Sequence, residues 1–278
     1  MCARHDTLKL SLSALSNQSI SRSQFEVIIV DNSSDEAHQL KSIVGSFQNL
    51  IQIKCFREKK PSSYRARNRG VVESTGRILA FLDSDCIADP TWLEEGLNFF
   101  ERDGSEFIIA GKIRRISKSR TGNLIERHEK LFTLNQRRNV LSNNFGATAN
   151  LMCTRNLFFK VGPFRSDLLS GGDVEWCHRA QLKGAKLIYT PRVVIYHQLV
   201  SSLGDLLKRY RRKAGGTYKL KKENLFYINT KPYRGFNPSA FLTRKLFFHP
   251  IRIMHISILI IQKLEGLFCF FGKKPIHG

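Results

Sequence analysis

The chain has 278 residues, of which 42% are apolar, so it is long enough for one α/β domain with a substantial core and an appendage. Its six cysteines contain no Cys-x-x-Cys pair, which excludes a dense disulfide framework, disfavours a zinc cluster and suits a reducing cytosol. Lys and Arg total 45 against 23 Asp and Glu, and the net charge of +22 favours anionic partners such as nucleic acid, an anionic membrane face or a phosphorylated substrate.

Helical and strand patterns alternate along the first 200 residues. We expect strands at 25–30, 51–56, 78–82, 107–113, 147–153, 187–189 and 193–196, and helices at 7–18, 35–48, 62–74, 90–101, 123–138 and 173–183. This order predicts an open α/β fold with a mostly parallel central sheet flanked by helices. Ligands of such sheets bind beyond the carboxyl ends of the strands, which is where Asp31 and Asp83 lie.

Two acidic residues, Asp83 and Asp85, directly follow the apolar strand ILAFL. Because one residue separates them in a turn, their carboxylates can point toward a shared position. Hard oxygen ligands of this kind suit Mg²⁺ or Mn²⁺, which can bind a diphosphate and stabilise it as a leaving group. An Asp-Ser-Asp triplet also forms solvated turns through Asx hydrogen bonds, so the residues alone leave a metal site and a turn open.

A second acidic segment, SGGDVEW at residues 170–176, lies where a helix begins. Its glycines allow close approach of the backbone, and Asp173 and Glu175 fall in the first helical turn. Asp173 is suited to act as a general base toward an acceptor hydroxyl. Acidic side chains in a first turn are also stabilised by the helix dipole, so a capping role is the alternative.

Two further features could contact phosphate or metal. The arginines of RARNRG, residues 65–70, lie near a helix start, where phosphate can bind, and a solvated basic face is the alternative. His197 follows the strand VVIY. A lone histidine there is more often structural, and it gains a functional interpretation where the fold brings it near Asp85.

Together, five segments resemble the inverting GT-A glycosyltransferases of glycosyltransferase family 2. They are VDNSSDE (30–36), ARNRG (66–70), ILAFLDSDC (78–86), GATANLMCTRNLFFKVGPF (146–164) and SGGDVEW (170–176), in matching order and spacing. The resemblance implies a GT-A fold and transfer of a sugar, with inversion, from a nucleotide-diphospho-sugar to an acceptor hydroxyl. It also implies Mn²⁺ or Mg²⁺ as cofactor and a place in cell-surface polysaccharide or glycolipid synthesis.

On the donor side, the resemblance assigns four residues. Asp31 resembles the acid that contacts the nucleotide base, and Arg67 matches the arginine beside the diphosphate. Asp83 and Asp85 match the metal and sugar-nucleotide motif, in which Asp85 is the direct metal ligand.

On the acceptor side, Asp173 matches the catalytic base and Glu175 resembles the acid that helps to shape the acceptor site. His197 resembles a histidine that approaches the metal or the diphosphate in some members. The family usually has Gly-Glu-Asp before and at the base, whereas this chain has Gly171-Gly172-Asp173, so one acid of the pattern is absent.

The start of the chain also departs from the family, which begins with an apolar strand and a Pro-x-Tyr-Asn type of turn. The residues MCARHDTLKL resemble those just after that turn, so we expect the first strand to be absent. Loss of a central strand would leave unpaired backbone groups and an open seam. The chain as given is then a defective or weakly active form, or the true start lies upstream.

We expect residues 1–200 to form the catalytic domain and residues 201–278 a basic, amphipathic helical extension. Positive charge is concentrated in KRYRRK (208–213) and KLKK (219–222). The apolar segment 246–271 is interrupted by charges and is suited to a helix in a membrane interface rather than a span. We expect a cytoplasmic enzyme, peripheral on the inner face of the cytoplasmic membrane, with a glycan or lipid-linked acceptor; packing on the catalytic domain or a dimer contact is the alternative.

Two other functions are compatible with parts of the pattern. A metal-dependent nucleotidyltransferase also uses paired acids, but the sequence shows no Gly-rich loop with a catalytic lysine. A basic nucleic-acid-binding protein would use the net charge and the tyrosines among the lysines of the extension, but no recognised binding motif accompanies them. We therefore expect a nucleotide-sugar donor and an anionic membrane surface as partners, and no specific nucleic acid.

Overall fold

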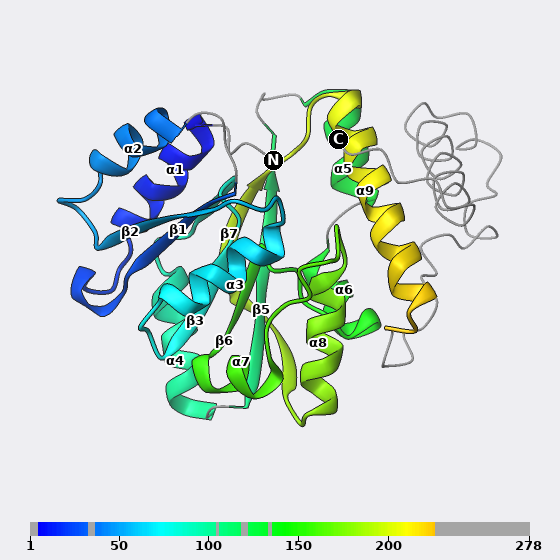
Figure 1. The fold of residues 1–278 in the computed structure, drawn as a ribbon. Helices are drawn as coiled ribbons and strands as arrows, with labels where there is room; N and C mark the ends of the chain where they lie inside the picture. Colours follow the sequence, from blue (N-terminus) through cyan, green and yellow to red (C-terminus); the bar gives the residue numbers. More distant parts are fainter. Residues whose placement is uncertain (1–4, 33–36, 104–105, 118–121, 133–134, 226–278) are drawn as a thin grey trace.

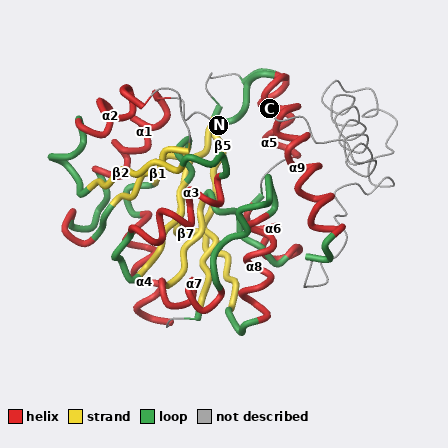
Figure 2. The backbone as a smooth tube through the Cα atoms, viewed as in Figure 1, coloured by secondary structure: helices red, strands yellow, loops and turns green. Residues whose placement is uncertain are grey.

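The computed structural model describes residues 5–32, 37–103, 106–117, 122–132 and 135–225 (Figures 1 and 2). Its helices are α1 (His5–Ser16), α2 (Ala37–Gly45), α3 (Ser63–Glu73), α4 (Trp92–Asp103), α5 (Leu124–Phe132), α6 (Gln136–Asn143), α7 (Arg155–Val161), α8 (Gly172–Leu182) and α9 (Leu203–Lys222). Its strands are β1 (Val27–Asn32), β2 (Ile53–Glu58), β3 (Ile78–Leu82), β4 (Cys86–Ala88), β5 (Phe107–Ile116), β6 (Asn150–Thr154) and β7 (Lys186–Gln198).

Most predicted elements are confirmed, with two differences. The helix expected at 123–138 is divided into α5 and α6, because Asn135 caps a new helix by accepting a hydrogen bond from the Arg138 N–H (3.0 Å). The two short strands expected near 187–196 form the single strand β7. The helical character expected for the basic extension is confirmed for α9, whereas the apolar segment 246–271 lies outside the described residues.

The strands form two sheets. β1 and β2 pair in parallel, and the other five strands have the order β3-β6-β5-β7-β4. Within the five-stranded sheet only β5 and β7 are parallel; the pairs β3–β6, β5–β6 and β4–β7 are antiparallel. The prediction of a mostly parallel sheet is therefore wrong, and the central sheet is mixed. Short apolar runs such as ILAFL and NLMCT carry no pattern that distinguishes the two strand directions.

In the part of the chain that the structure describes, four strands are sheet edges: β1 and β2 in the small sheet, and β3 and β4 in the large one. Among the described residues, β1 pairs only with β2 and β3 only with β6. All six residues of β1 are partly exposed, in contrast to β6, which is buried along its length. The absence of the family's first strand stays a prediction.

The five-stranded sheet separates two apolar cores. Ile108 and Ala110 of β5 belong to one core and Ile109 to the other, because alternate side chains of a strand point to opposite faces. Helices α3, α7 and α8 contribute to the first core, which contains Trp176. Helices α1, α2 and α4 contribute to the second, which contains Trp92. This α/β/α layering, visible in Figure 1, confirms the predicted fold class.

Helix α9 packs against the segment that precedes α8. A Cβ added at Gly216 would lie 2.4 Å from the carbonyl oxygen of Ser170, so the two backbones are in close contact. Leu220 fills the space beside Gly171, where an added Cβ would lie 2.5 Å from its side chain. The boundary predicted at residue 200 therefore precedes a helix that packs on the catalytic part of the chain, and a separate extension stays a prediction for residues beyond 225.

This contact predicts opposite effects for two alanine substitutions in α9. Gly216→Ala is expected to destabilise the protein by about 1–3 kcal/mol, as forcing extra atoms into a packed contact usually does, because its neighbour is backbone that cannot rotate away. Gly204 has nothing within 4 Å of an added Cβ, so Gly204→Ala is expected to be neutral or to stabilise by up to about 1 kcal/mol. Denaturant unfolding of both variants measures the difference, and equal stabilities would contradict the tight packing of α9.

Candidate active site

The turn between β3 and β4 carries Asp83 and Asp85. The Asp83 carbonyl oxygen accepts a hydrogen bond from the Cys86 N–H (2.9 Å), which closes the turn. Because β4 pairs antiparallel with β7, Cys86 lies opposite His197. Asp85 directly precedes Cys86 and so comes beside the histidine, with 3.8 Å between Asp85 Oδ2 and His197 Nε2. The proximity that gives His197 a functional interpretation is present.

The chemistry of this group fits a hard divalent cation. Ligand atoms of Asp85, Cys86 and His197 lie within 4.8 Å of one another. His197 Nδ1 contacts the Gln198 carbonyl oxygen (2.7 Å); donation there leaves the Nε2 lone pair available on the side of Asp85. Burial raises the pKa of the Cys86 thiol, which donates to Asp85 (3.8 Å) and stays neutral. A carboxylate and an imidazole remain, and both suit Mn²⁺.

Asp83 forms an ion pair with Arg67 of α3. Arg67 Nη2 donates to Asp83 Oδ1 at 2.6 Å, with 19% of the arginine and 34% of the aspartate side chain exposed. Burial acts to raise the pKa of Asp83, but the attraction to Arg67 and, after it, to His197 outweighs burial, so the pKa lies below its usual range. Asp83 is therefore ionised and positions Arg67, whereas the Asp85 side chain is 42% exposed.

Tyr64 connects Arg67 to the segment that holds the candidate base. The Arg67 guanidinium lies over the Tyr64 ring, 5.6 Å from its centroid. The Tyr64 hydroxyl accepts a hydrogen bond from the Gly172 N–H (2.8 Å), and a Cβ added at Gly172 would lie 2.7 Å from the ring. The ring thus occupies the place of a side chain at 172, which gives a physical reason for glycine where the family usually has glutamate.

Asp173 follows Gly172 in the first turn of α8. Burial raises the pKa of its carboxyl group, and the charge of Arg67 offsets part of that effect. The carboxylate accepts a hydrogen bond from the Val174 N–H (3.1 Å), and it interacts electrostatically with both members of the Arg67–Asp83 pair. A carboxylate with a raised pKa is a stronger base once ionised, which suits proton abstraction from a hydroxyl.

Two other candidate residues have different surroundings. Glu175 is 1% exposed, and both of its oxygens are bound by Arg179 (2.7 and 3.0 Å), which also donates to two carbonyl oxygens at the end of α7. These contacts fix α8 to α7 and give Glu175 a packing role; its part in an acceptor site stays a prediction. The Asp31 side chain, at the end of β1, is 8% exposed and lies 3.9 Å from Arg57 Nε.

Helix α9 brings basic side chains close to the candidate active site. From the sequence alone, these residues were expected to belong to an extension that binds a membrane surface. Arg212 interacts electrostatically with Asp83, and Lys213 interacts with Asp173. Arg209 lies close enough to oppose the charge of both cations. The charge of KRYRRK was evident in the sequence, but its proximity to the candidate base depends on the glycine contacts of α9, which no local pattern indicates. Tyr64 was missed for the same reason, because its contacts cross the fold.

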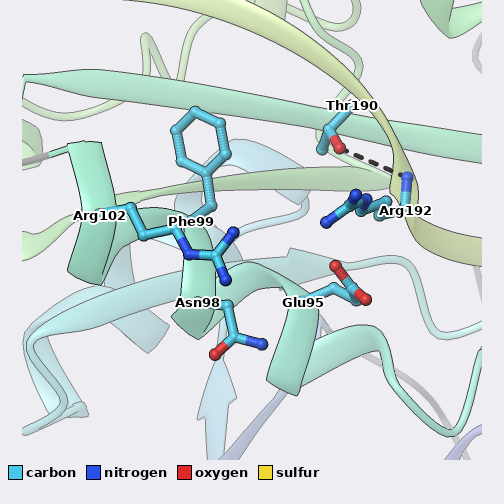
Figure 3. Close-up of a pocket in the computed structure, with 6 residues that line it drawn as sticks. All are labelled: Glu95, Asn98, Phe99, Arg102, Thr190 and Arg192. Atoms are coloured by element: carbon cyan, nitrogen blue, oxygen red, sulfur yellow. Dashed lines mark hydrogen bonds between the residues drawn. The ribbon is translucent and has the colours of Figure 1, made fainter.

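A separate pocket lies between α4 and the middle of β7 (Figure 3). It is lined by Glu95, Asn98, Phe99, Arg102, Thr190 and Arg192. The Arg192 backbone N–H donates to the Thr190 hydroxyl (3.3 Å), as Figure 3 shows. None of the candidate catalytic or metal-binding residues lines this pocket.

Comparison with known proteins supports the resemblance to glycosyltransferase family 2. A sequence model of the family described as Glycosyl transferase family 2 matches residues 1–166. Glycosyltransferase AglE of Haloferax volcanii is 31% identical over 216 residues, which cover 76% of this chain and 68% of that protein. The Pre-mycofactocin glycosyltransferase of Mycobacterium tuberculosis is 30% identical over 190 residues, which cover 66% of this chain but 39% of that protein.

Solved structures show the same fold at low identity. A mannosyltransferase from Pyrobaculum calidifontis, in complex with GDP-Man and Mn²⁺, superposes with a TM-score of 0.61 at 15% identity, covering 98% of this chain and 74% of that one. TarS 1–349 of S. aureus superposes with a TM-score of 0.55 at 18% identity, covering 92% and 76%. Within the described ranges, no helix combines the length and apolarity that crossing a membrane requires.

Proposed function

Because the chain belongs to glycosyltransferase family 2 and is a nucleotide-sugar glycosyltransferase, we propose that it transfers the sugar to an acceptor hydroxyl with inversion at the anomeric carbon. The observation that carries the proposal is the convergence of a base, Asp173, with the Arg67–Asp83 ion pair next to the turn that holds Asp85. Family membership decides against the nucleotidyltransferase and nucleic-acid-binding alternatives.

In the proposed reaction, Asp173 accepts the proton of the acceptor hydroxyl. The hydroxyl oxygen forms a bond to the anomeric carbon while the bond from that carbon to the diphosphate oxygen breaks, and the nucleoside diphosphate leaves with the electron pair. Asp83 positions Arg67 toward the diphosphate, and the Tyr64–Gly172 hydrogen bond holds the base-bearing segment against α3. Attack on the face opposite the leaving group produces inversion.

We propose Asp85 and His197 as the residues that hold Mn²⁺ or Mg²⁺. Support comes from their 3.8 Å separation, from the contact that fixes His197 Nδ1, and from structurally similar proteins that contain Mn²⁺. Such an ion supplies positive charge that stabilises the leaving diphosphate. Asp31, at the end of β1, is proposed to contact the nucleotide base.

A peripheral location on the inner membrane face, with a glycan or lipid-linked acceptor of cell-surface synthesis, is also proposed. Three lysines of α9 are available to an anionic surface because their side chains are exposed: Lys208, Lys221 and Lys222. Flotation with anionic liposomes at low salt tests this location. Protein that stays in the bottom fraction at low salt would contradict it.

A donor screen tests the proposed function directly. Thermal unfolding is measured with UDP-, GDP- and dTDP-sugars, each with Mn²⁺ and again with a chelator. A donor present at about 100 times its Kd is expected to stabilise the fold by about 2.7 kcal/mol, and the chelator is expected to remove the effect. Absence of stabilisation by every nucleotide sugar, or stabilisation independent of metal, would count against the assignment.

A further inference from the structure

One face of α9 is pressed onto the catalytic segment and carries cations. Lys213 lies three residues before Gly216, beside the part of the helix that meets Ser170, and is half-buried, whereas Arg212, four residues before Gly216, is exposed. The close backbone contact at Gly216 fixes the distance of that face from the start of α8. The cations are therefore held over the region of Asp173 by packing, not by a mobile chain end.

Most charges around the site are already compensated. Arg67 is paired with Asp83, and Arg209 is paired with Glu129, which is 1% exposed. Lys213 is different: it is partly buried, and no carboxylate among the described residues forms an ion pair with it. Its ammonium lies 5.8 Å from the centroid of the Tyr210 ring.

The surroundings of Lys213 favour the arrival of an anion. Burial and, after it, the positive charges of Arg209 and Arg212 lower its pKa to about 8, and the carboxylates of Glu129 and Asp173 offset only part of that effect. A partly desolvated cation without a paired anion is unfavourable, and a hydrogen-bonded anion would remove that cost. Lys213 is half-buried and interacts with Asp173, so an anion bound to it would lie in the candidate active site rather than on the outer surface.

The two cations of α9, Arg212 and Lys213, interact with different acidic residues of the candidate site. Arg212 interacts with Asp83, on the side of the donor diphosphate, and Lys213 interacts with Asp173. A general base must lie within hydrogen-bond reach of the hydroxyl that it deprotonates, so the group beside Asp173 meets the acceptor. This step rests on the proposed role of Asp173.

We infer that Lys213 binds an anionic group of the acceptor, a phosphate or a carboxylate, close to the hydroxyl that reacts. The acceptor is then a charged molecule, such as a sugar phosphate ester or an acidic sugar, and not a neutral glycan. Lys213 selects it by a charge-assisted hydrogen bond.

The experiment compares matched probes on the full chain. With Mg²⁺ and a saturating nucleoside diphosphate in the donor site, binding of hexose 1-phosphates, hexuronic acids and methyl hexosides is measured by ligand-observed NMR titration. One anionic series is expected to bind more tightly than its neutral counterpart, and which series does so identifies phosphate or carboxylate. Lys213→Met is expected to weaken that series by about 10- to 100-fold, the cost of losing one hydrogen bond to a charged group, and to leave the methyl hexosides unchanged.

Two control variants separate this role from a structural one. Lys9→Met removes an exposed charge from α1, outside the site and outside α9, and is expected to leave the binding of every probe unchanged. Lys213→Arg keeps the charge: wild-type affinity for the anion is expected to fall as pH rises through about 8, where Lys213 loses its proton, whereas the arginine variant keeps its affinity there.

Three outcomes would overturn the inference. The wild-type chain could bind charged and neutral probes equally, Lys213→Met could leave the preference intact, or it could weaken the nucleoside diphosphate instead, which would make Lys213 a donor-side residue. In each of these cases the nucleoside diphosphate still binds wild-type protein, so the proposed function stands. Failure of every nucleoside diphosphate to bind with Mg²⁺ or Mn²⁺ would overturn the proposed function and this inference with it.

Discussion

Replacing Asp173 by asparagine is expected to lower turnover by about 10²- to 10⁴-fold, the usual contribution of a general base. The amide has the same shape and keeps an oxygen for the Val174 N–H, which lies 3.1 Å from the carboxylate, but it cannot accept the hydroxyl proton. The fold should remain intact, since burial disfavours the charge that the substitution removes. Transfer from the donor identified by the screen, measured with donor binding, separates loss of chemistry from loss of affinity.

Asp167→Asn is the matched control. Asp167 is an exposed aspartate on the segment before Asp173, and its carboxylate pairs with Arg165 (2.5 Å) and Lys219 (2.7 Å). Removing its charge is expected to leave turnover unchanged, whereas loss of turnover in both variants would point to a general electrostatic effect. Full turnover in Asp173→Asn would exclude Asp173 as the base.

The pH dependence of the wild-type enzyme follows from the same residue. A base must be ionised to accept a proton, so turnover is expected to rise with pH through the pKa of Asp173. Because burial raises that pKa, the acidic limb of the profile is expected above the range of an ordinary aspartate. Asp173→Asn should lack this limb in its residual activity.

The sequence was sufficient for the fold class and for most elements because these depend on local periodicity. The strand ILAFL and the Ser62 cap of α3 depend on neighbouring residues, and β3 and α3 appear within a residue or two of their predicted bounds. Strand direction is a property of pairs of distant segments. That is why the sheet was wrongly expected to be mostly parallel, while β6 runs antiparallel to both of its neighbours.

The same distinction applies to the site. The position of Asp83 and Asp85 after a buried strand was sufficient to make them candidates, and their order with Asp173 supported the family. The approach of His197 to Asp85 required the pairing of Cys86 with His197 across two strands, which no local pattern encodes. The place of Lys213 required the backbone contact between α9 and Ser170, and a run of basic residues is compatible with a solvated face as well.

The second large effect concerns the metal. Asp85→Asn is expected to weaken metal-dependent nucleotide binding by about 100-fold or more, since loss of even an outer partner of a metal ligand costs about 10- to 100-fold. The side chain is 42% exposed, and its nearest ion-pair partner among the described residues is His197 at 3.8 Å, so the fold should tolerate the amide. The measurement is Mn²⁺ titration of nucleotide binding, and unchanged Mn²⁺ dependence would exclude Asp85 as a ligand.

Cys86→Ala shows which donor set holds the metal. Cys86 is fully buried next to Asp85, and its sulfur lies within 4.8 Å of the ligand atoms of Asp85 and His197. A hard ion such as Mn²⁺ or Mg²⁺ prefers oxygen and tolerates imidazole, whereas thiolate ligands select softer metals such as Zn²⁺. If Asp85 and His197 bind the ion alone, Cys86→Ala keeps the Mn²⁺ dependence and His197→Gln weakens it. If instead Cys86→Ala abolishes binding and Zn²⁺ replaces Mn²⁺ as the preferred ion, the site is a thiolate centre, and the assignment of a hard cation to the diphosphate is wrong.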